Sequence, residues 1–431
     1  MIGRMSRHAP FAVLLLLYLV IAALYASRTP AWQAPDEPAH YNYIRQLAAG
    51  DMPLMEAGDY DEAAKNAAVS SRFDPQFPII ELEYEDYQPP LYYLTLAPVF
   101  RLFDGDLVAL RLTSVLLGAV TVTLTYAIAS RLFMSAALAL TVTAFVALLP
   151  QHLAILGSVN NDALAGMLVA AMLWVVVRAR SAEHNPPLYP LALLLGLAFL
   201  TKVTAYLMAG ALGFWLLYLH WGEWRKLIVD GLKLFVPALL IGAIWWGRNI
   251  IVYPGPDFLG TIRHDAIVFG QPTTAEWVAE FGGGFVLWSF LRTSFRSFYG
   301  QFGWMCCTLP SWAYPPLLLL TVAGVVGAFW RLRRGVRREW LVLLGSLLGF
   351  NALLYVVYNL SFVQHQGRYL FVSLIPIGVG FVAGWREWLR PILNRIPFVI
   401  WLLPLTIAVG FLGLNLYFLR FIAPCMSLAG C

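Results

Sequence analysis

Long apolar stretches separated by short polar breaks recur along the whole 431-residue chain. Many approach the roughly 20 residues that an α-helix needs to cross the hydrocarbon core of a bilayer. The period-2 alternation of a membrane β-barrel is not seen. The pattern therefore predicts an all-α polytopic membrane protein. The eleven predicted spans are 10–27, 107–130, 134–150, 160–178, 188–202, 204–221, 227–246, 312–331, 340–358, 369–385 and 398–419.

Two of these stretches allow a second interpretation. The run 188–221 has the length of one long helix, but Lys202 in FLTKVTAY interrupts it, so we predict two helices joined by a tight hairpin. The run 10–27 has the position of a signal peptide. It is longer than the usual apolar region of roughly 7–15 residues, and LYAS is a poor cleavage site, so we expect a retained anchor.

Composition agrees with a membrane protein, since 60% of the residues are hydrophobic and 12% are charged. Soluble domains carry about 25% charged residues. The net charge of +5 does not indicate a nucleic-acid partner, because basic residues beside spans orient a membrane protein among its lipids. We find no repeat and no soluble domain, and therefore expect residues 1–431 to form a single membrane domain.

The basic residues predict the orientation. With a cytoplasmic N-terminus, the short cytoplasmic loops contain Arg131, Arg178, Arg180, Arg225, Lys226, the run RLRRGVRR (331–338), Arg386, Arg390 and Arg395. The short loops on the other side contain only Lys202 and Arg368. By the positive-inside rule, the long segments 28–106 and 247–311 and the tail from Arg420 are then extracytoplasmic. We expect the plasma membrane as the location.

All four cysteines fall on the predicted external side: Cys306, Cys307, Cys425 and Cys431. An oxidising compartment permits disulfides. Adjacent cysteines rarely bond each other, so either Cys306 or Cys307 could bond a cysteine of the tail. Free thiols are an equally good interpretation.

The first external segment begins with a helix signal, PDEPAHYNYIRQLAAG. Asp36 is a good N-cap, Pro38 suits the first turn, and Gly50 ends the helix. Asp36 and His40 are one turn apart and share a face. Taken alone, Asp36 is an ordinary helix cap and His40 an ordinary hydrogen-bonded residue.

A second helix signal follows in YEDYQPPLYYLTLAPVFRLF, 84–103. Two prolines precede a short apolar helix that Pro98 interrupts. We expect this helix to lie at the membrane interface rather than cross it. Glu85 and Asp86, just before it, are interpreted as a solvated edge of the loop.

Eight weak motifs occur in a characteristic order along nearly the whole chain: PDEPAHYNYIRQLAAGDMPL, QPPLYYLTLAPVFRLF, ALRLTSVLLGAVTVTLTYAIASRLF, LPQHLAILGSVNNDALAGML, LAFLTKVTAYLM, WWGRNIIVYPGP, FRSFYGQFGWM and QGRYLFVSLIP. In this order the sequence resembles the membrane glycosyltransferases of the GT-C fold. The likeness is greatest to the family 39-like branch of protein O-mannosyltransferases and lipid A aminoarabinose transferases. In that family an acidic residue of the first external loop is the catalytic centre, and Asp36 matches it.

The resemblance implies a polyprenyl-phosphate sugar as donor, because the predicted site is external and we find no soluble domain to hold a nucleotide sugar. Such a donor carries its own leaving group, which needs a cation rather than a protonated acid. The attacking hydroxyl needs a base. We expect Asp36 to be that base in an inverting displacement. Glu37 is the second choice, or orients the acceptor, which is a protein, lipid or glycan of the cell envelope.

The candidate cations for the donor phosphate are Lys202, Arg248 and Arg368, each at the external end of a predicted span. Arg368 is preferred, since its planar fork suits phosphate. Snorkelling of these side chains to the lipid headgroups is the alternative. Many relatives carry a lysine where this chain has Gln88, so here another cation must meet the phosphate, or the donor differs.

Three further features are open to two interpretations. Asp162 in NND either takes part in the site or has a structural role, as a polar contact between helices or as an N-cap. Asp36, Glu37 and His40 could hold a divalent ion together with substrate oxygens. Because many relatives near this branch work without metal, we expect no metal and no cofactor. In 285–305, Arg292 and Arg296 share a face of a helix that either walls the acceptor groove or anchors the chain in the interface.

Two rival functions follow from the same sequence. A lipid-linked sugar flippase or transporter would need charges within its spans and inverted repeats, and intramembrane charges such as Asp230 and Lys233 are few. A ligase or polymerase that joins whole lipid-linked glycans would differ only in its larger acceptor.

Overall fold

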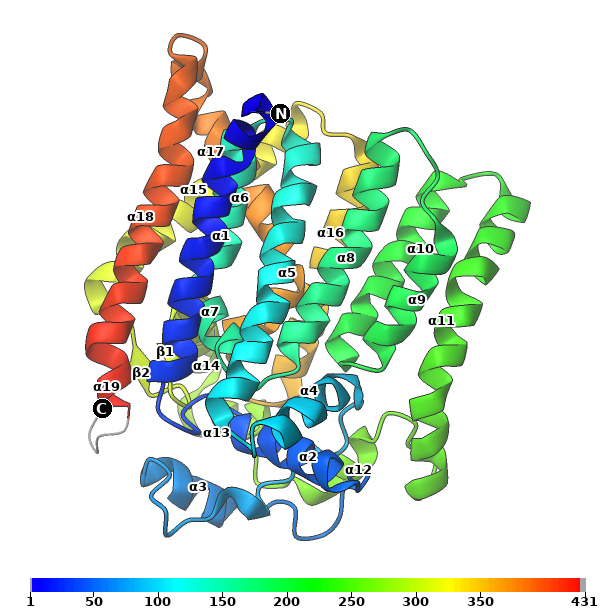
Figure 1. Cartoon of the computed structure of the whole chain (residues 1–431), viewed down its shortest axis with the longest axis vertical. Coiled ribbons are helices and arrows are strands. Elements are labelled where there is room, and N and C mark those ends of the chain that lie inside the picture. Colours follow the sequence, from blue (N-terminus) through cyan, green and yellow to red (C-terminus); the bar gives the residue numbers. More distant parts are fainter. Residues whose placement is uncertain (1, 427–431) are drawn as a thin grey trace.

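The long helices lie side by side in a single bundle, with the N-terminus at one end and helix α19 at the other (Figure 1). The computed structural model describes residues 2–426, with side chains from residue 8 onward. Its long helices are α1 (Ile2–Arg28), α5 (Leu107–Phe133), α8 (Asp162–Ser181), α11 (Trp224–Val252), α15 (Tyr314–Arg333), α16 (Arg338–Ser361), α17 (Leu374–Leu393) and α18 (Leu402–Tyr417).

Within the described residues, eight helices are long and apolar enough to cross a membrane. A ninth span would consist of α6 (Ala136–Leu148) and α7 (Pro150–Leu156), which meet at 59°. Pro150 explains this bend, because a residue before proline is disfavoured in the helical region, and Leu149 adopts φ −59° and ψ 118°. The chain is therefore an all-α, multi-pass membrane protein.

The predicted count of eleven spans is not confirmed. All eleven predicted segments are helical, but α9 (Leu188–Phe199) and the pair η2 (Val203–Tyr206) and α10 (Leu207–Leu219) are shorter apolar helices. The break between them falls at Leu200–Lys202, where the sequence places it. The predicted division of the run 188–221 into two helices at Lys202 is therefore confirmed.

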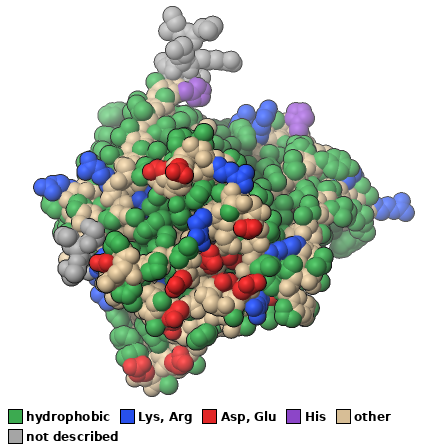
Figure 2. Space-filling view, turned by 60° about the horizontal axis from the view of Figure 1, so that its bottom comes forward, with side chains coloured by type: hydrophobic (Ala, Val, Ile, Leu, Met, Phe, Trp, Pro, Cys, Tyr) green, Lys and Arg blue, Asp and Glu red, His purple; other side chains and the backbone are tan. Residues whose placement is uncertain are grey.

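Both long polar segments gather at one end of the bundle (Figure 1). The first contains α2 (Glu37–Ala49), α3 (Glu62–Ser70), η1 (Ile79–Glu81) and α4 (Leu91–Leu102). The second contains α12 (Thr261–Ile267), α13 (Thr274–Phe281), α14 (Gly283–Tyr299), the hairpin β1 (Gln301–Phe302) and β2 (Cys307–Thr308), and η3 (Ser311–Ala313). Shorter pieces are η4 (Gly367–Ser373), η5 (Pro397–Trp401), η6 (Phe418–Ile422) and α19 (Ala423–Cys425). Acidic and basic side chains collect near the centre of this end (Figure 2).

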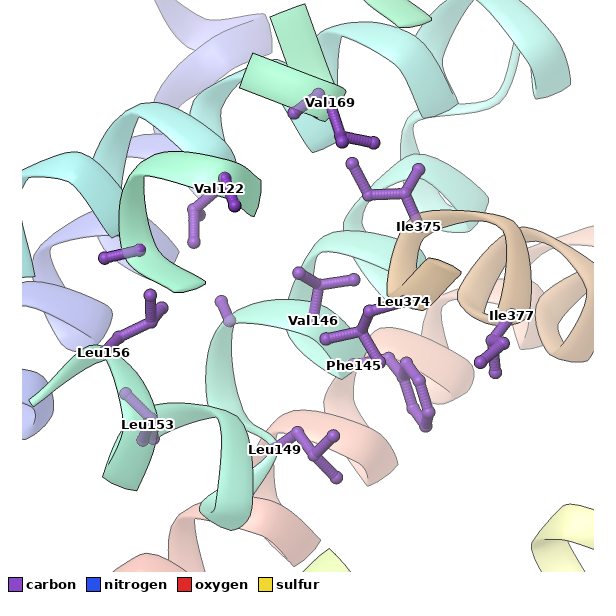
Figure 3. Close-up of a cluster of buried hydrophobic side chains, with 14 of the residues drawn as sticks. Val122, Phe145, Val146, Leu149, Leu153, Leu156, Val169, Leu374, Ile375 and Ile377 are labelled. Carbon is purple, nitrogen blue, oxygen red and sulfur yellow. The ribbon is translucent and has the colours of Figure 1, made fainter. Parts of the chain in front are cut away.

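Two hydrophobic cores support this polar end. The larger is formed where α5–α8 meet α17, by residues such as Val122, Phe145, Leu153, Val169 and Ile375 (Figure 3). A second, smaller core joins the two polar segments through Ala39, Met55, Tyr60, Leu82, Tyr84, Tyr253, Ile267 and Val268. The polar segments are thus packed against each other rather than left as separate loops.

The cysteine question is resolved in part. Cys306 and Cys425 are free thiols in this structure, and the Sγ atoms of Cys306 and Cys307 lie 3.1 Å apart. Cys431, the other predicted partner of a disulfide, lies outside the described residues.

Candidate active site

Asp36 occupies the N-cap position of α2 as predicted, but its side chain makes no capping hydrogen bond. Its backbone adopts the left-handed conformation, with φ 68° and ψ −5°. Aspartate tolerates this region better than most residues. The carboxylate instead accepts a hydrogen bond from Arg368 Nη2 at 2.7 Å and one from the Tyr84 hydroxyl at 3.2 Å. The side chain is therefore not serving as a helix cap.

Arg368 reaches Asp36 because its backbone is packed tightly against α14. A Cβ at Gly367 would come within 2.2 Å of the Ser294 carbonyl oxygen, so only glycine fits there. The Gly367 N–H also donates to Ser297 Oγ at 2.7 Å. Arg368 Nε donates to Gln366 Oε1 at 2.7 Å, which fixes the guanidinium facing Asp36.

Arg368 also changes the acidity of Asp36. Burial alone would raise the pKa of this carboxyl, but its surroundings, chiefly the charge and hydrogen bond of Arg368, hold the pKa below its ordinary value. Asp36 is therefore ionised. Its affinity for a proton stays low as long as Arg368 is paired with it.

A second ion pair stands beside the first. Lys202, in the break after α9, lies 2.7 Å from Asp162 at the start of α8. Asn160 Oδ1 accepts a hydrogen bond from the Asp162 N–H at 2.9 Å, while the N-cap residue of that helix, Asn161, makes no side-chain capping bond. The sequence predicted both residues for the site, and the structure brings them together with Asp36 and Arg368 around one cavity.

His40 lies one turn after Asp36 and faces the same cavity. Its Nδ1 is 2.9 Å from the Tyr93 hydroxyl, which also accepts from Asn161 Nδ2 at 3.3 Å. Burial is the main reason that the pKa of His40 falls to about 3, although Asp36 acts in the opposite direction. His40 is therefore neutral at physiological pH.

Two cavities meet at this site. The helix-side cavity, about 290 Å³, is lined by Asp36, His40, Glu85, Tyr87, Gln88, Asn160, Asp162, Lys202, Val203, Thr204, Thr261, Asn351, Leu354, Tyr355, Tyr358, Arg368 and Tyr369. The loop-side cavity, about 280 Å³, is lined by the polar segments, including Tyr60, Glu62, Lys65, Gln271 and Trp304. They share a wall made of Asp36, Glu85, Tyr87, Tyr358, Arg368 and Tyr369.

Glu37 is placed differently from the sequence-based expectation. Its side chain is fully buried and does not line either cavity. Arg111 holds it with two hydrogen bonds, of 2.8 and 2.6 Å, and the backbone N–H groups of Val159 and Trp32 donate to it at 3.1 and 3.2 Å. Each carboxylate oxygen already has a protein donor, so this geometry assigns Glu37 to joining the loop to the bundle.

Arg111, the partner of Glu37, is the residue that the sequence-based prediction missed in this contact between the loop and the bundle. Its guanidinium also donates to the carbonyl oxygens of Ala26, Thr29 and Pro30. An arginine near the start of an otherwise apolar span is costly unless it has a partner. That signal was present in the sequence, although it does not identify Glu37 as the partner.

Arg248 and Gln88 also have defined places. Arg248 does not line either cavity, and it donates to the Pro53 carbonyl and, at 3.0 Å, to Asn249 Oδ1. It therefore fixes the first loop against the end of α11.

Gln88 lines the helix-side cavity and donates to the Tyr87 hydroxyl at 3.0 Å. Its Oε1 is buried without a hydrogen-bond partner.

Glu85 and Asp86 are not a solvated edge, and that prediction was wrong. Asp86 is 1% exposed and accepts a hydrogen bond from Gln46 at 2.7 Å. Glu85 lies in the wall shared by the two cavities, with its Oε2 buried and unpartnered. The polar face of α2 causes this burial, because Asn42 and Gln46 hold the segment 79–86 against the helix.

Other expectations concern a metal and the helix 285–305. The described residues contain no group of three or more His, Cys, Asp and Glu side chains placed to hold a metal ion. The set Asp36, Glu37 and His40 does not form because Arg111 engages Glu37.

The helix predicted in 285–305 is α14. Neither Arg292 nor Arg296 lines the two cavities, and Arg296 lies 4.9 Å over the Tyr314 ring.

Comparison with known proteins gives a family match over part of the chain and a shared fold. Residues 87–246 match the family described as dolichyl-phosphate-mannose-protein mannosyltransferase. The fold is similar to that of ArnT from Cupriavidus metallidurans, solved with undecaprenyl phosphate bound. That match has a TM-score of 0.51 and 16% identity, over 98% of this chain and 74% of ArnT. No curated protein matches the sequence.

A second solved structure shares the fold, the Archaeoglobus fulgidus oligosaccharyltransferase in complex with zinc and sulfate. Here the TM-score is 0.50 and the identity 13%, over 96% of this chain and 53% of that enzyme. The chain thus spans about half the length of the oligosaccharyltransferase. The chain has the GT-C fold, of the type found in protein mannosyltransferases and ArnT. The family match and the fold together support a membrane glycosyltransferase.

Proposed function

We propose that the chain is an inverting glycosyltransferase that moves a sugar from a polyprenyl phosphate to an acceptor hydroxyl at the extracytoplasmic face. One observation carries this proposal: the Asp36 carboxylate leaves its helix uncapped and faces the junction of two cavities, where Arg368 holds it. A carboxylate at the meeting point of two substrate spaces suits a general base. The ArnT structure with undecaprenyl phosphate supports a lipid-linked donor.

The helix-side cavity suits the donor. It contains both cations, Lys202 and Arg368, and is bounded by Leu354 and Tyr355 of α16, against which a lipid tail can lie. The loop-side cavity suits the acceptor, since it is lined largely by polar side chains of the two long segments. The sugar would then lie at the shared wall, beside Asp36.

The reaction follows from these positions. The acceptor oxygen bonds to the anomeric carbon while the bond from that carbon to the phosphate oxygen breaks, and polyprenyl phosphate leaves with the electron pair. Asp36 takes the proton of the acceptor hydroxyl, a contribution of about 10²–10⁴-fold. Because the displacement is single, the configuration at the anomeric carbon inverts.

Donor binding would also activate the base. Both cavity cations are already paired with carboxylates, Arg368 with Asp36 and Lys202 with Asp162. A phosphate that draws Arg368 toward itself weakens its hold on Asp36, and the pKa of Asp36 then rises toward the range where a carboxylate accepts a proton more readily. Gln88, which carries no charge, leaves this task to Arg368 and Lys202.

The direct test uses purified protein and a panel of radiolabelled polyprenyl-phosphate sugars, with envelope protein, lipid and glycan fractions as acceptors. We expect label from one donor to appear in an acceptor, and expect transfer by Asp36→Asn to be slower by about 10²–10⁴-fold. Label that crosses a reconstituted bilayer without a new covalent bond would instead indicate a flippase.

The face of the membrane requires its own test. In a background without the native cysteines, Glu56→Cys and Gly335→Cys place one exposed thiol in each of the regions predicted to be outside and inside. We expect an impermeant maleimide to label position 56 in intact cells and position 335 only after lysis. The reverse pattern would place the site in the cytoplasm and remove the argument for a lipid-linked donor.

A further inference from the structure

Glu85 is a second carboxyl group in the wall that the two cavities share. The segment 84–88 places it there, next to Tyr84, which donates to Asp36. Both oxygens of Asp36 have protein donors, whereas Oε2 of Glu85 is buried and has no hydrogen-bond partner. A buried polar atom left in this state has lost its hydration without a replacement hydrogen bond, a loss that a ligand able to bond it would make good.

The charges around Glu85 do not favour its ionised form. The two cations of the helix-side cavity already have carboxylate partners, Asp36 and Asp162, so each pair is close to neutral. A third carboxylate beside Asp36 would add a negative charge, and the phosphate of the proposed donor would add another. Burial, and then the charge of Asp36, raise the pKa of Glu85 to about 8, against the effects of Lys202, Gln88 and Arg368.

The titratable and charged groups that share the two cavities with Glu85 come from every surrounding element: Asp36 and His40 from α2, Tyr60, Glu62, Lys65, Tyr84 and Tyr87 from the first segment, Asp162 from α8, Lys202 from the break after α9, His264 from α12, Tyr355 and Tyr358 from α16, and Arg368 and Tyr369 from η4. Among them, Asp36 carries the negative charge with the largest effect on Glu85.

We propose that Glu85 acts as a neutral carboxylic acid whose hydroxyl donates a hydrogen bond to a hydroxyl oxygen of the transferred sugar, and so holds the sugar beside Asp36. This role rests on the proposed function. It divides two neighbouring carboxyl groups between two tasks: Asp36, held ionised by Arg368, accepts a proton, and Glu85 donates a hydrogen bond without releasing its proton.

Asp86 provides a matched control. It is buried, and its pKa is also raised to about 8, mainly by burial, yet it does not line either cavity and is bonded to Gln46. A general effect of alkaline pH on this loop would involve both residues. An effect through the sugar would involve Glu85 alone.

The experiment measures kcat/KM from pH 6 to 10 for the wild type, Glu85→Gln, Glu85→Ala and Asp86→Asn. For the wild type we expect a fall of about tenfold per pH unit above roughly pH 8, as one proton is lost. Glu85→Gln keeps a neutral donor at every pH, so it should stay within about tenfold of the wild type at pH 7 and lose the alkaline fall. Glu85→Ala should lose about 10–100-fold at pH 7, and Asp86→Asn should keep the alkaline fall.

An alkaline fall that persists in Glu85→Gln, or disappears in Asp86→Asn, would overturn this role. A second measurement needs no turnover: the infrared carbonyl band of a protonated carboxyl should be lost in Glu85→Gln and should shift when the donor binds. A protein that transfers sugar normally but shows no such shift would refute the role of Glu85 alone. Absence of transfer from every donor would remove the proposed function, and this role with it.

Discussion

Two adjacent carboxylates at the start of α2 have the same kind of partner and opposite surroundings. Glu37 is bonded to Arg111 in a fully buried pair, with two backbone N–H groups as further donors. Asp36 is bonded to Arg368, but its side chain is 27% exposed and borders two cavities. An ion pair alone therefore does not mark a site. What distinguishes the two is whether a ligand can reach the carboxylate.

The backbone explains the difference. Asp36 lies in the left-handed region, whereas Glu37 is the first residue of the helix, so their side chains leave the chain in different directions. A non-glycine residue held in that region costs roughly 1–3 kcal/mol, and such residues cluster at functional sites. Arg111, by tying Glu37 to the ends of α1 and α5, helps to hold the turn that directs Asp36 toward the cavities.

Asp36→Asn should give the largest effect on activity. Asparagine suits the left-handed region and the N-cap position, but it cannot accept the proton, so kcat/KM should fall by about 10²–10⁴-fold, or roughly 3–5 kcal/mol in the barrier. The melting temperature should stay close to that of the wild type. A folded Asp36→Asn protein that transfers sugar at the wild-type rate would end the catalytic assignment.

Glu37→Gln should reduce stability more than activity, which is the opposite of the result expected for Asp36→Asn. It leaves the buried charge of Arg111 without its carboxylate, and breaking such a pair costs about 3–5 kcal/mol of stability. We expect a lower melting temperature and a lower yield in thermal-shift and expression measurements. Activity per folded molecule should fall less than in Asp36→Asn, and a larger fall with unchanged stability would return Glu37 to the catalytic set.

Arg368→Ala tests the ion pair between Arg368 and Asp36 by removing its basic partner. It should raise the KM for the donor by about 10–100-fold, as expected for a lost hydrogen bond to a charged group. Because Arg368 holds the pKa of Asp36 down, its removal should also move the acidic limb of the pH–rate profile to higher pH. Arg292→Ala, an exposed arginine of α14, is the control and should change neither quantity. Equal donor affinities in the two variants would remove Arg368 from the site.

Gly367→Ala should have the smallest effect of the four. A methyl group there meets the Ser294 carbonyl and the backbone of Phe298, and overpacking of this kind costs about 1–3 kcal/mol. The strain should displace Arg368, so donor affinity should fall together with thermal stability. Loss of stability without any change in donor KM would show that Arg368 finds its position by another route.

Local signals in the sequence determined the helices that build the site. The proline and glycine around α2, the two prolines before α4 and the interruption at Lys202 each act within a few residues, and the structure has the helices where they predict them. Long apolar runs likewise determined the membrane class, because burial in lipid depends on composition. The ArnT/mannosyltransferase resemblance, carried by short motifs in order, agrees with the fold.

The tertiary structure decided which charge meets which partner. Glu37 and Arg111 are 74 positions apart, and Asp36 and Arg368 are 332 apart. Nothing local distinguishes Glu37 from Asp36 as the residue to be enclosed, or Arg248 from Arg368 as the one to reach a cavity. Glu85 became part of the site only because α2 holds its segment inward. Pairing between charges is a long-range property, since it depends on how already formed helices pack.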